Sequence, residues 1–161
     1  MKAFAAETPD QMATYEVMTG MSGLEFVQAI FEGRIAGAPI ARTLNMWIHS
    51  VEDGEVEFRG IPEFGAMNPM NMVHGGWYGT LLDSALGCAV MTRVPRGHFY
   101  TTLEYKVNLC RQIPVGTEVR CIGRVRHSGR STGVADGLVT GIDDDRVYAT
   151  GSTTCIIMKA G

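Results

Sequence analysis

The hydrophobic pattern of the N-terminal region predicts one short helix after a polar arm. Apolar residues recur at helical spacing between Leu24 and Phe31, and Gly33 follows as a natural stop. The segment Ser22–Glu25 matches the capping-box pattern, in which a serine and a glutamate three residues later satisfy each other's backbone amides. We therefore expect residues 1–40 to form an arm and a short helix ahead of the main domain.

Further along, the pattern predicts two groups of strands. Apolar and polar residues alternate through Leu44–Ile48 and again at Val56–Phe58, and Asp53-Gly54 between them favours a tight hairpin turn. Turn signals also separate four later runs with strand character. These runs span Phe99–Leu109, Thr117–Arg126, Ser131–Ile142 and Arg146–Met158. Because the strands follow one another through hairpins and do not alternate with helices, they indicate a mostly antiparallel sheet.

Between the two groups of strands, the sequence predicts a helix of about five turns. Its apolar side chains occupy more than one face and include Leu81, Leu82, Ala85, Leu86, Ala89 and Val90. A helix that is apolar on several sides must be wrapped by a sheet or packed against a partner chain. We therefore expect residues 41–161 to form an α+β domain, in which a curved antiparallel sheet of six strands surrounds one long central helix.

The composition is typical of one ordinary globular domain, with 161 residues of which 45% are hydrophobic and 19% charged. A chain of this size needs no metal or disulfide to fold. Cys88, Cys110, Cys121 and Cys155 lie 22, 11 and 34 positions apart, without a CxxC pair or a zinc motif. We expect reduced, buried thiols in a cytoplasmic protein. The longest segment without charged residues, Phe64–Leu82, contains Asn, His and glycine, so we expect no membrane span.

The charge is unevenly distributed along the chain. A net charge of −3 argues against a general nucleic-acid binder. Residues 111–130, however, contain five arginines and one acid, so this window carries +4 and the remainder −7. Two interpretations remain open at this point: a local anion site, or a solvated face of a strand pair with no specific function.

The residues with the clearest chemical meaning are Asn68, His74-Gly75-Gly76 and Asp83. Two glycines at a helix start leave its first amides accessible, and these amides with the helix dipole can stabilise an oxyanion. Asp83 is a lone carboxylate in an apolar helix, where burial is unfavourable unless the group is used. Asp83 could instead reach solvent or bind the hydroxyls of a neighbouring strand, and His74 could simply tie the loop to a carbonyl.

The spacing of His74 and Asp83 places a constraint on how the site is assembled. Nine residues separate them, so on one straight helix they lie about 13 Å apart. Two such helices, packed antiparallel across a two-fold axis, would bring the glycine-rich start of one helix near the middle of the other. We therefore expect a homodimer whose sites combine residues from both subunits.

The pattern N-x5-HGG-x6-D resembles the PaaI-like acyl-CoA thioesterases of the hotdog superfamily, the 4-hydroxybenzoyl-CoA thioesterase-like proteins. The resemblance extends from about Leu44 to Ile157 and departs at Asn71, where the family usually has glycine. Asparagine tolerates the left-handed conformation, so the turn can form. The resemblance implies the hotdog fold, a homodimer that associates further into a dimer of dimers, acyl-CoA as substrate, a cytoplasmic location and no cofactor apart from the coenzyme A carried by the substrate.

The resemblance also implies roles for individual residues. Asp83 would be the nucleophile or the general base that activates water, and Thr102, or its neighbour Thr101, would place the water or the carboxylate. The Gly75 amide would polarise the thioester carbonyl, and Gly76 would open the approach. Two further residues, Asn68 and His74, would position the carbonyl or the leaving sulfur. A thiolate leaves without a strong general acid, so no metal is required.

The nucleotide end of coenzyme A would bind Arg126, Gly129 and Arg130, since guanidinium groups form bidentate contacts with phosphates. The reaction implied is hydrolysis of a medium-chain or aromatic, phenylacetyl-type acyl-CoA. Two other functions remain open on the same fold: hydration or dehydration of an acyl thioester, and acyl-CoA binding without catalysis. The chain lacks the His-Phe-Pro type of segment found in such dehydratases.

Overall fold

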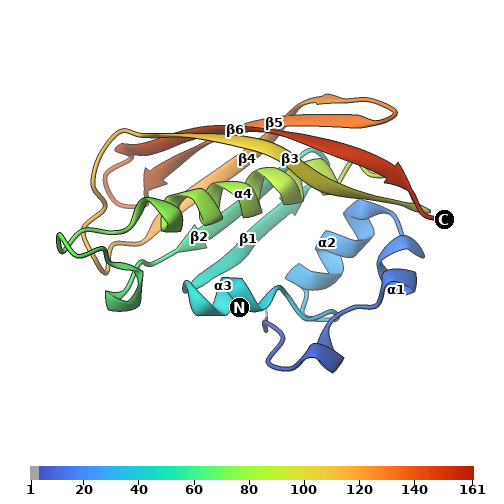
Figure 1. Ribbon diagram of the computed structural model, residues 1–161, viewed down its shortest axis with the longest axis horizontal. Coiled ribbons are helices and arrows are strands. Elements are labelled where there is room, and N and C mark those ends of the chain that lie inside the picture. The colour runs from blue at the N-terminus through green and yellow to red at the C-terminus, as the bar shows by residue number, and fades with distance from the viewer. Residues whose placement is uncertain (1–3) are drawn as a thin grey trace.

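One long helix, α4 (Gly75–Met91), packs against a face of a six-stranded antiparallel sheet in this computed structural model, which describes residues 4–161 (Figure 1). The strands are β1 (Met46–Glu52), β2 (Glu55–Gly60), β3 (His98–Leu109), β4 (Val119–Ser128), β5 (Thr132–Gly141) and β6 (Val147–Lys159). The predicted α+β architecture, a hotdog fold, is therefore confirmed. Residues 1–3 of the predicted N-terminal arm lie outside the described residues.

The sheet order is β1-β2-β4-β5-β6-β3, and every neighbouring pair is antiparallel. The predicted hairpin between β1 and β2 is present, with Gly54 at φ 84° in its turn. Asn71 adopts φ 59°, the left-handed conformation predicted for it in the loop before α4. Strands β1 and β3 form the two edges of the sheet, so β3 has a free side for further strand pairing.

The predicted N-terminal helix is α2 (Gly23–Phe31), and its capping box is formed by Ser22 and Glu25. Three short elements that the sequence did not predict accompany it: the 3-10 helix Pro9–Gln11, α1 (Tyr15–Thr19) and α3 (Pro39–Thr43). Because α3 begins at a proline and continues to its C-cap, Leu44 ends this helix and does not begin β1. The predicted domain boundary after residue 40 stays a prediction.

Helix α4 lies close to the sheet because a row of glycines faces it. Gly123, Gly137 and Gly151 are register partners across β4, β5 and β6. A Cβ atom added at Gly123 would lie 2.4 Å from the carbonyl oxygen of Ala85, on the helix backbone. Above this row the helix buries Leu82 and its other large apolar side chains completely. The row therefore lets the helix backbone approach the sheet more closely than any residue with a side chain would allow.

The four cysteines are free, and their exposure differs from the prediction in one case. Cys121 and Cys155 are buried and Cys88 is half-buried, but Cys110 is exposed. The reason is its position directly after the end of β3, where the edge strand leaves the sheet. Within residues 4–161, no helix is long and apolar enough to cross a membrane.

A substitution at the glycine row tests this packing. Gly123→Ala should lower the free energy of unfolding by about 1–3 kcal/mol, because the added methyl group meets helix backbone that cannot rotate away. The matched control is Gly65→Ala, where an added Cβ meets no atom within 4 Å. Denaturant unfolding of both variants provides the measurement. Equal stability of the two variants would contradict a close contact at Gly123.

Candidate functional site

His74 is the N-cap of α4, and its ring bonds the first turn of the helix. Its Nδ1 accepts a hydrogen bond from the Gly76 amide at 2.8 Å, which assigns the ring proton of the neutral histidine to Nε2. The sequence had left open that His74 binds a loop carbonyl. The His74 ring instead accepts a hydrogen bond from an amide of its own helix. The Gly75 amide has no acceptor among the described residues. Of the two glycine amides, only that of Gly75 is therefore available to a ligand.

Asn68 organises the loop that leads into α4. Its side-chain Oδ1 accepts hydrogen bonds from the backbone amides of Met70, at 2.9 Å, and Met72, at 3.2 Å. The left-handed Asn71 closes the same turn with a bond to the Asn68 carbonyl. The Asn68 Nδ2 group has no acceptor within residues 4–161, so it can still donate to a ligand.

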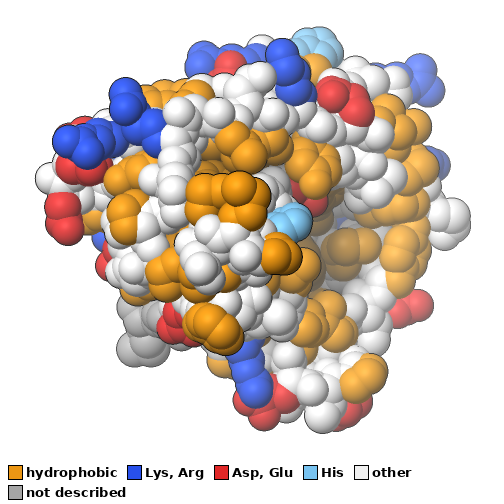
Figure 2. All heavy atoms as spheres, turned by 60° about the vertical axis from the view of Figure 1, so that its left-hand side comes forward, with side chains coloured by type: hydrophobic (Ala, Val, Ile, Leu, Met, Phe, Trp, Pro, Cys, Tyr) orange, Lys and Arg blue, Asp and Glu red, His pale blue; other side chains and the backbone are white. Residues whose placement is uncertain are grey.

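Asn68 and Gly75 line the same groove, which has a volume of about 340 Å³ and also includes Tyr78, Leu109 and Arg111. Tyr78 fixes the wall of this groove, because its hydroxyl accepts from the Ile113 amide and donates to the Arg111 carbonyl. Hydrophobic side chains surround a hollow on the side of the molecule that carries the loop before α4 (Figure 2). The groove therefore presents amide donors next to apolar surface.

Asp83 lies eight residues into α4 from Gly75 and is half-buried. Its Oδ1 accepts a hydrogen bond from Thr102 Oγ1 at 3.1 Å, so Thr102 is the candidate threonine that contacts Asp83. Tyr100 and Thr102 alternate with Thr101 in regular register, so Thr102 faces the helix and Thr101 does not. The β-bulge between Thr102 and Glu104 shifts the alternation only beyond this point. The sequence had left open that Asp83 only binds a hydroxyl of a neighbouring strand. Thr102 is such a hydroxyl, but it occupies only Oδ1 of the carboxylate. Oδ2 has no hydrogen-bond partner in the part of the chain described.

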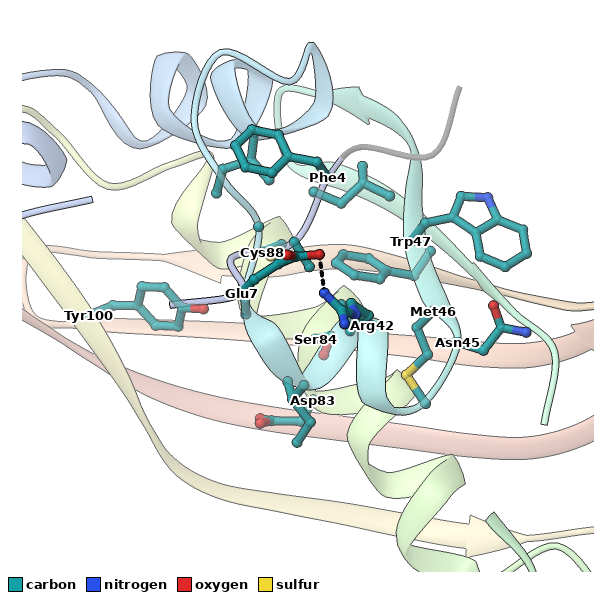
Figure 3. A pocket seen from close by; sticks show the side chains of 18 residues that line it. Phe4, Glu7, Arg42, Asn45, Met46, Trp47, Asp83, Ser84, Cys88 and Tyr100 are labelled. Carbon is teal, nitrogen blue, oxygen red and sulfur yellow. Dashed lines mark hydrogen bonds and ion pairs between the residues drawn. The ribbon is translucent and has the colours of Figure 1, made fainter. Parts of the chain in front are cut away.

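Asp83 lines a second cavity, of about 590 Å³, which is separate from the groove (Figure 3). Ser84 and Cys88 of α4 and Tyr100 of β3 also line it. Burial, and then the nearby Asp83 carboxylate, raises the pKa of the Cys88 thiol to about 12. Cys88 is therefore protonated at neutral pH and is no nucleophile. Burial likewise raises the pKa of Tyr100, which stays a hydrogen-bond donor.

Within one chain, the structure does not bring the two halves of the predicted site together. Gly75 and Asp83 are separated by about 12 Å along α4. The groove with Gly75 and the cavity with Asp83 share no lining residue. The groove therefore has the free Gly75 amide but no carboxylate from Asp83, and the cavity has the Asp83 carboxylate but no amide from Gly75.

The predicted anion-binding arginines differ in their surroundings. Arg126 Nε donates to Asp136 Oδ2 at 2.8 Å, an ion pair that raises the pKa of the guanidinium. Arg130 lies in the turn between β4 and β5 beside Gly129 and has no ion-pair partner within residues 4–161. Arg111 likewise has no acidic partner among these residues. Of the two arginines chosen from the sequence, Arg130 is therefore the one with a free guanidinium.

Sequence reasoning missed Tyr100, Arg111 and the part of the Asp83 cavity that residues 4–45 supply. The alternation of Tyr100 with Thr102 along the predicted strand could have placed this tyrosine on the helix face. Arg111 belonged to the arginine window but was not chosen from it. No local pattern points to the N-terminal contribution, because it depends on tertiary packing. Among residues 4–161, no group of three or more acidic, His or Cys side chains is placed to hold a metal ion.

This chain is similar to known thioesterases. Residues 70–148 match the model of the thioesterase superfamily. A thioesterase family protein from Silicibacter pomeroyi is similar in structure, with 25% identity, a TM-score of 0.70, and coverage of 76% of this chain and 90% of that chain. The PaaI protein of the E. coli phenylacetic acid degradation operon has 20% identity and a TM-score of 0.72, covering 86% of this chain and 94% of that chain.

A third similar structure is a hypothetical thioesterase from Streptococcus pneumoniae with coenzyme A. Its identity is 24% and its TM-score 0.65, with coverage of 73% of this chain and 89% of that chain. Together with the superfamily match, these structures confirm the resemblance drawn from the sequence. A comparison with curated protein sequences gives no match.

The capping role of His74 is open to a direct test. His74→Ala should lower the free energy of unfolding by about 1 kcal/mol, because the Gly76 amide loses its acceptor. His74→Asn should keep most of the stability, since asparagine is a strong N-cap residue. Thermal and denaturant unfolding of the two variants would measure the difference. If the alanine variant were as stable as the wild type, the cap would be unimportant for α4.

Proposed function

We propose that this thioester hydrolase, whose residues 70–148 match the thioesterase superfamily model, cleaves medium-chain or aromatic acyl-CoA thioesters at a site shared by two copies of the chain. The proposal rests mainly on the positions of two functional groups along α4. The helix offers a free amide at Gly75 and a carboxylate with one free oxygen at Asp83, in separate cavities. Thioester hydrolysis needs both groups at one carbonyl carbon.

The edge strand β3 supports a dimer. Its exposed apolar side chains Leu103, Tyr105 and Leu109 are 59%, 49% and 56% accessible in the single chain. A long edge strand with apolar side chains and unpaired backbone groups favours pairing with another strand. In our proposal β3 pairs with its own copy across a two-fold axis, which sets the two α4 helices antiparallel. Gly75 of one subunit then approaches Asp83 of the partner.

The chemistry follows from these two groups. Either the Asp83 carboxylate attacks the thioester carbonyl, or it takes a proton from a water molecule that attacks. In both cases the electron pair of the carbonyl moves onto oxygen, and the Gly75 amide with the N-terminal dipole of α4 stabilises the oxyanion. Thr102, which donates to Oδ1, holds the carboxylate so that Oδ2 faces the carbonyl or the water.

The second half of the reaction requires little further assistance. As the oxyanion collapses, the carbon–sulfur bond breaks and the coenzyme A thiolate leaves. If Asp83 acts as the base, the thiolate takes up the proton removed from water. If Asp83 attacks directly, an anhydride between the acyl group and Asp83 forms, and water then hydrolyses it to the free acid, with the released proton going to the thiolate. A thiol with an ordinary pKa of about 8.5 is a good leaving group without a strong acid. The Nε2–H of His74 and the Nδ2 group of Asn68 are the donors proposed to position the carbonyl oxygen or the sulfur. Gly76 leaves the approach open.

Coenzyme A also requires cations for its phosphates. We assign this role to the turn between β4 and β5, where Arg130 has a free guanidinium and Gly129, whose amide donates to the Thr132 carbonyl, shapes the turn. Arg126 would contribute by exchanging or sharing its contact with Asp136. Arg111, beside Gly75 in the groove, is a further cation near the thioester. A cytoplasmic location fits this substrate and the four free thiols.

The proposal is tested by hydrolysis of a panel of acyl-CoAs, followed with a thiol reagent. Asp83→Asn should lower kcat by about 100-fold or more, because an amide neither attacks nor accepts the proton. It retains an oxygen for Thr102, so the fold should be unaffected. The matched control is Asp53→Asn, a surface carboxylate paired with Arg93, which should retain wild-type turnover.

Turnover of the Asp83→Asn variant close to wild type would contradict the mechanism. Binding of coenzyme A esters by a wild-type protein that hydrolyses none of them would favour the non-catalytic binding function instead.

A further inference from the structure

We propose that the N-terminal segment, residues 4–45, forms the far wall of the acyl pocket and determines which acyl groups the protein accepts, with uncharged, extended acyl groups preferred. This inference rests on the proposed acyl-CoA hydrolysis. It concerns a part of the chain that lies wholly outside residues 70–148, the region shared with the thioesterase superfamily model.

The lining of the Asp83 cavity carries the inference. One side consists of Asp83, Ser84 and Cys88 on α4. Much of the rest comes from the N-terminal segment, including Phe4 and Ile40. In the close view, Asp83 and Phe4 lie at opposite ends of the cavity (Figure 3). A substrate whose carbonyl sits at Asp83 can therefore extend its acyl group through the cavity toward this wall.

Backbone and side-chain bonds fix the wall to the rest of the fold. Ala5 forms a parallel bridge with Gly37, with hydrogen bonds of 2.9 Å on either side of it. An ion pair between Glu7 and Arg42 joins the arm to α3. At the end of α3, the Leu44 carbonyl accepts a bond from Trp77 of α4 at 2.9 Å. The segment is thus packed as a wall of the cavity and has a defined position relative to Asp83.

The charges of the cavity indicate the chemistry of its ligand. Among the described residues that line it, Glu7, Arg42 and Asp83 are the charged ones, and the first two neutralise each other. The remaining surface is mostly apolar. Its volume of about 590 Å³ falls in the range of small-molecule pockets, about 300–1,000 Å³. An acyl group with a terminal carboxylate would have to displace Glu7 from Arg42, whereas an uncharged chain would not.

Acyl-chain selectivity provides the test. We would measure kcat/KM of the wild-type protein for acetyl-, hexanoyl-, decanoyl- and adipyl-CoA, where adipyl-CoA matches hexanoyl-CoA in chain length but ends in a carboxylate. The wild type should prefer decanoyl- over acetyl-CoA, and hexanoyl- over adipyl-CoA by about tenfold or more, because the charged end is not matched by a free cation. Glu7→Gln, which leaves Arg42 unpaired, should reduce the second preference several-fold.

Two variants of the wall should reduce the ratio of decanoyl-CoA to acetyl-CoA activity by about tenfold, since each removes room or apolar surface for the acyl end. Ala41→Phe fills the cavity. Ile40→Asp places a charge at a position that is 49% exposed, so it should fold even if the first variant does not. The matched control is Leu138→Asp on β5, which is 46% exposed and does not line the cavity. Its ratio should equal that of the wild type.

Different results would contradict the proposed hydrolysis and the proposed role of the N-terminal wall. A wild-type protein that hydrolyses none of the four esters would contradict the proposed function and this inference with it. If the wild type is active but Ala41→Phe and Ile40→Asp keep the wild-type ratio, only the role of the N-terminal wall is overturned. The same holds if adipyl-CoA is hydrolysed as well as hexanoyl-CoA.

Discussion

The rest of the structure depends on the close packing of α4 against the glycine row of the sheet. Gly123, Gly137 and Gly151 face the helix across three neighbouring strands. The helix backbone at Ala85 fills the space beside Gly123, and the side chains of Leu86 and Leu82 pack on Gly137 and Gly151. The glycines sacrifice some strand stability, since they contribute no side-chain packing and lose more entropy on folding. In return the helix is held at a short distance and in one orientation, which fixes the direction of every side chain it carries.

This packing explains why the proposed site is divided. A helix held rigidly against a sheet cannot bend its two functional ends toward each other, so the Gly75 amide and the Asp83 carboxylate open into different cavities. The same sheet leaves β3 at its edge, with apolar side chains exposed along it. One arrangement, the central helix on a sheet that ends in β3, therefore separates the proposed catalytic groups in one chain and offers the edge through which a second chain would bring them together.

The sequence predicted the strands and the central helix well, because alternation and turn residues are local signals. It also predicted the left-handed Asn71. It left Thr101 and Thr102 undecided, since which face of β3 meets α4, and the β-bulge after Thr102 that switches this face along the strand, depend on pairing with β6. The contact of Arg126 with Asp136 depends on strand register in the same way. The N-terminal wall of the cavity had no sequence signal, because residues far apart in the chain create it only after folding.

The central claim, that each site uses Gly75 from one subunit and Asp83 from the other, is tested most directly by mixing two inactive variants. Gly75→Pro removes the free amide, and α4 should still form, since proline suits the first helical position and His74 before it is already extended at ψ 138°. The added Cβ meets only the end of the Leu109 side chain, at 3.2 Å. Co-expression with Asp83→Asn gives mixed dimers in which one of the two sites is intact, so the account predicts about a quarter of wild-type turnover. Mixed preparations no more active than either variant alone would contradict a shared site.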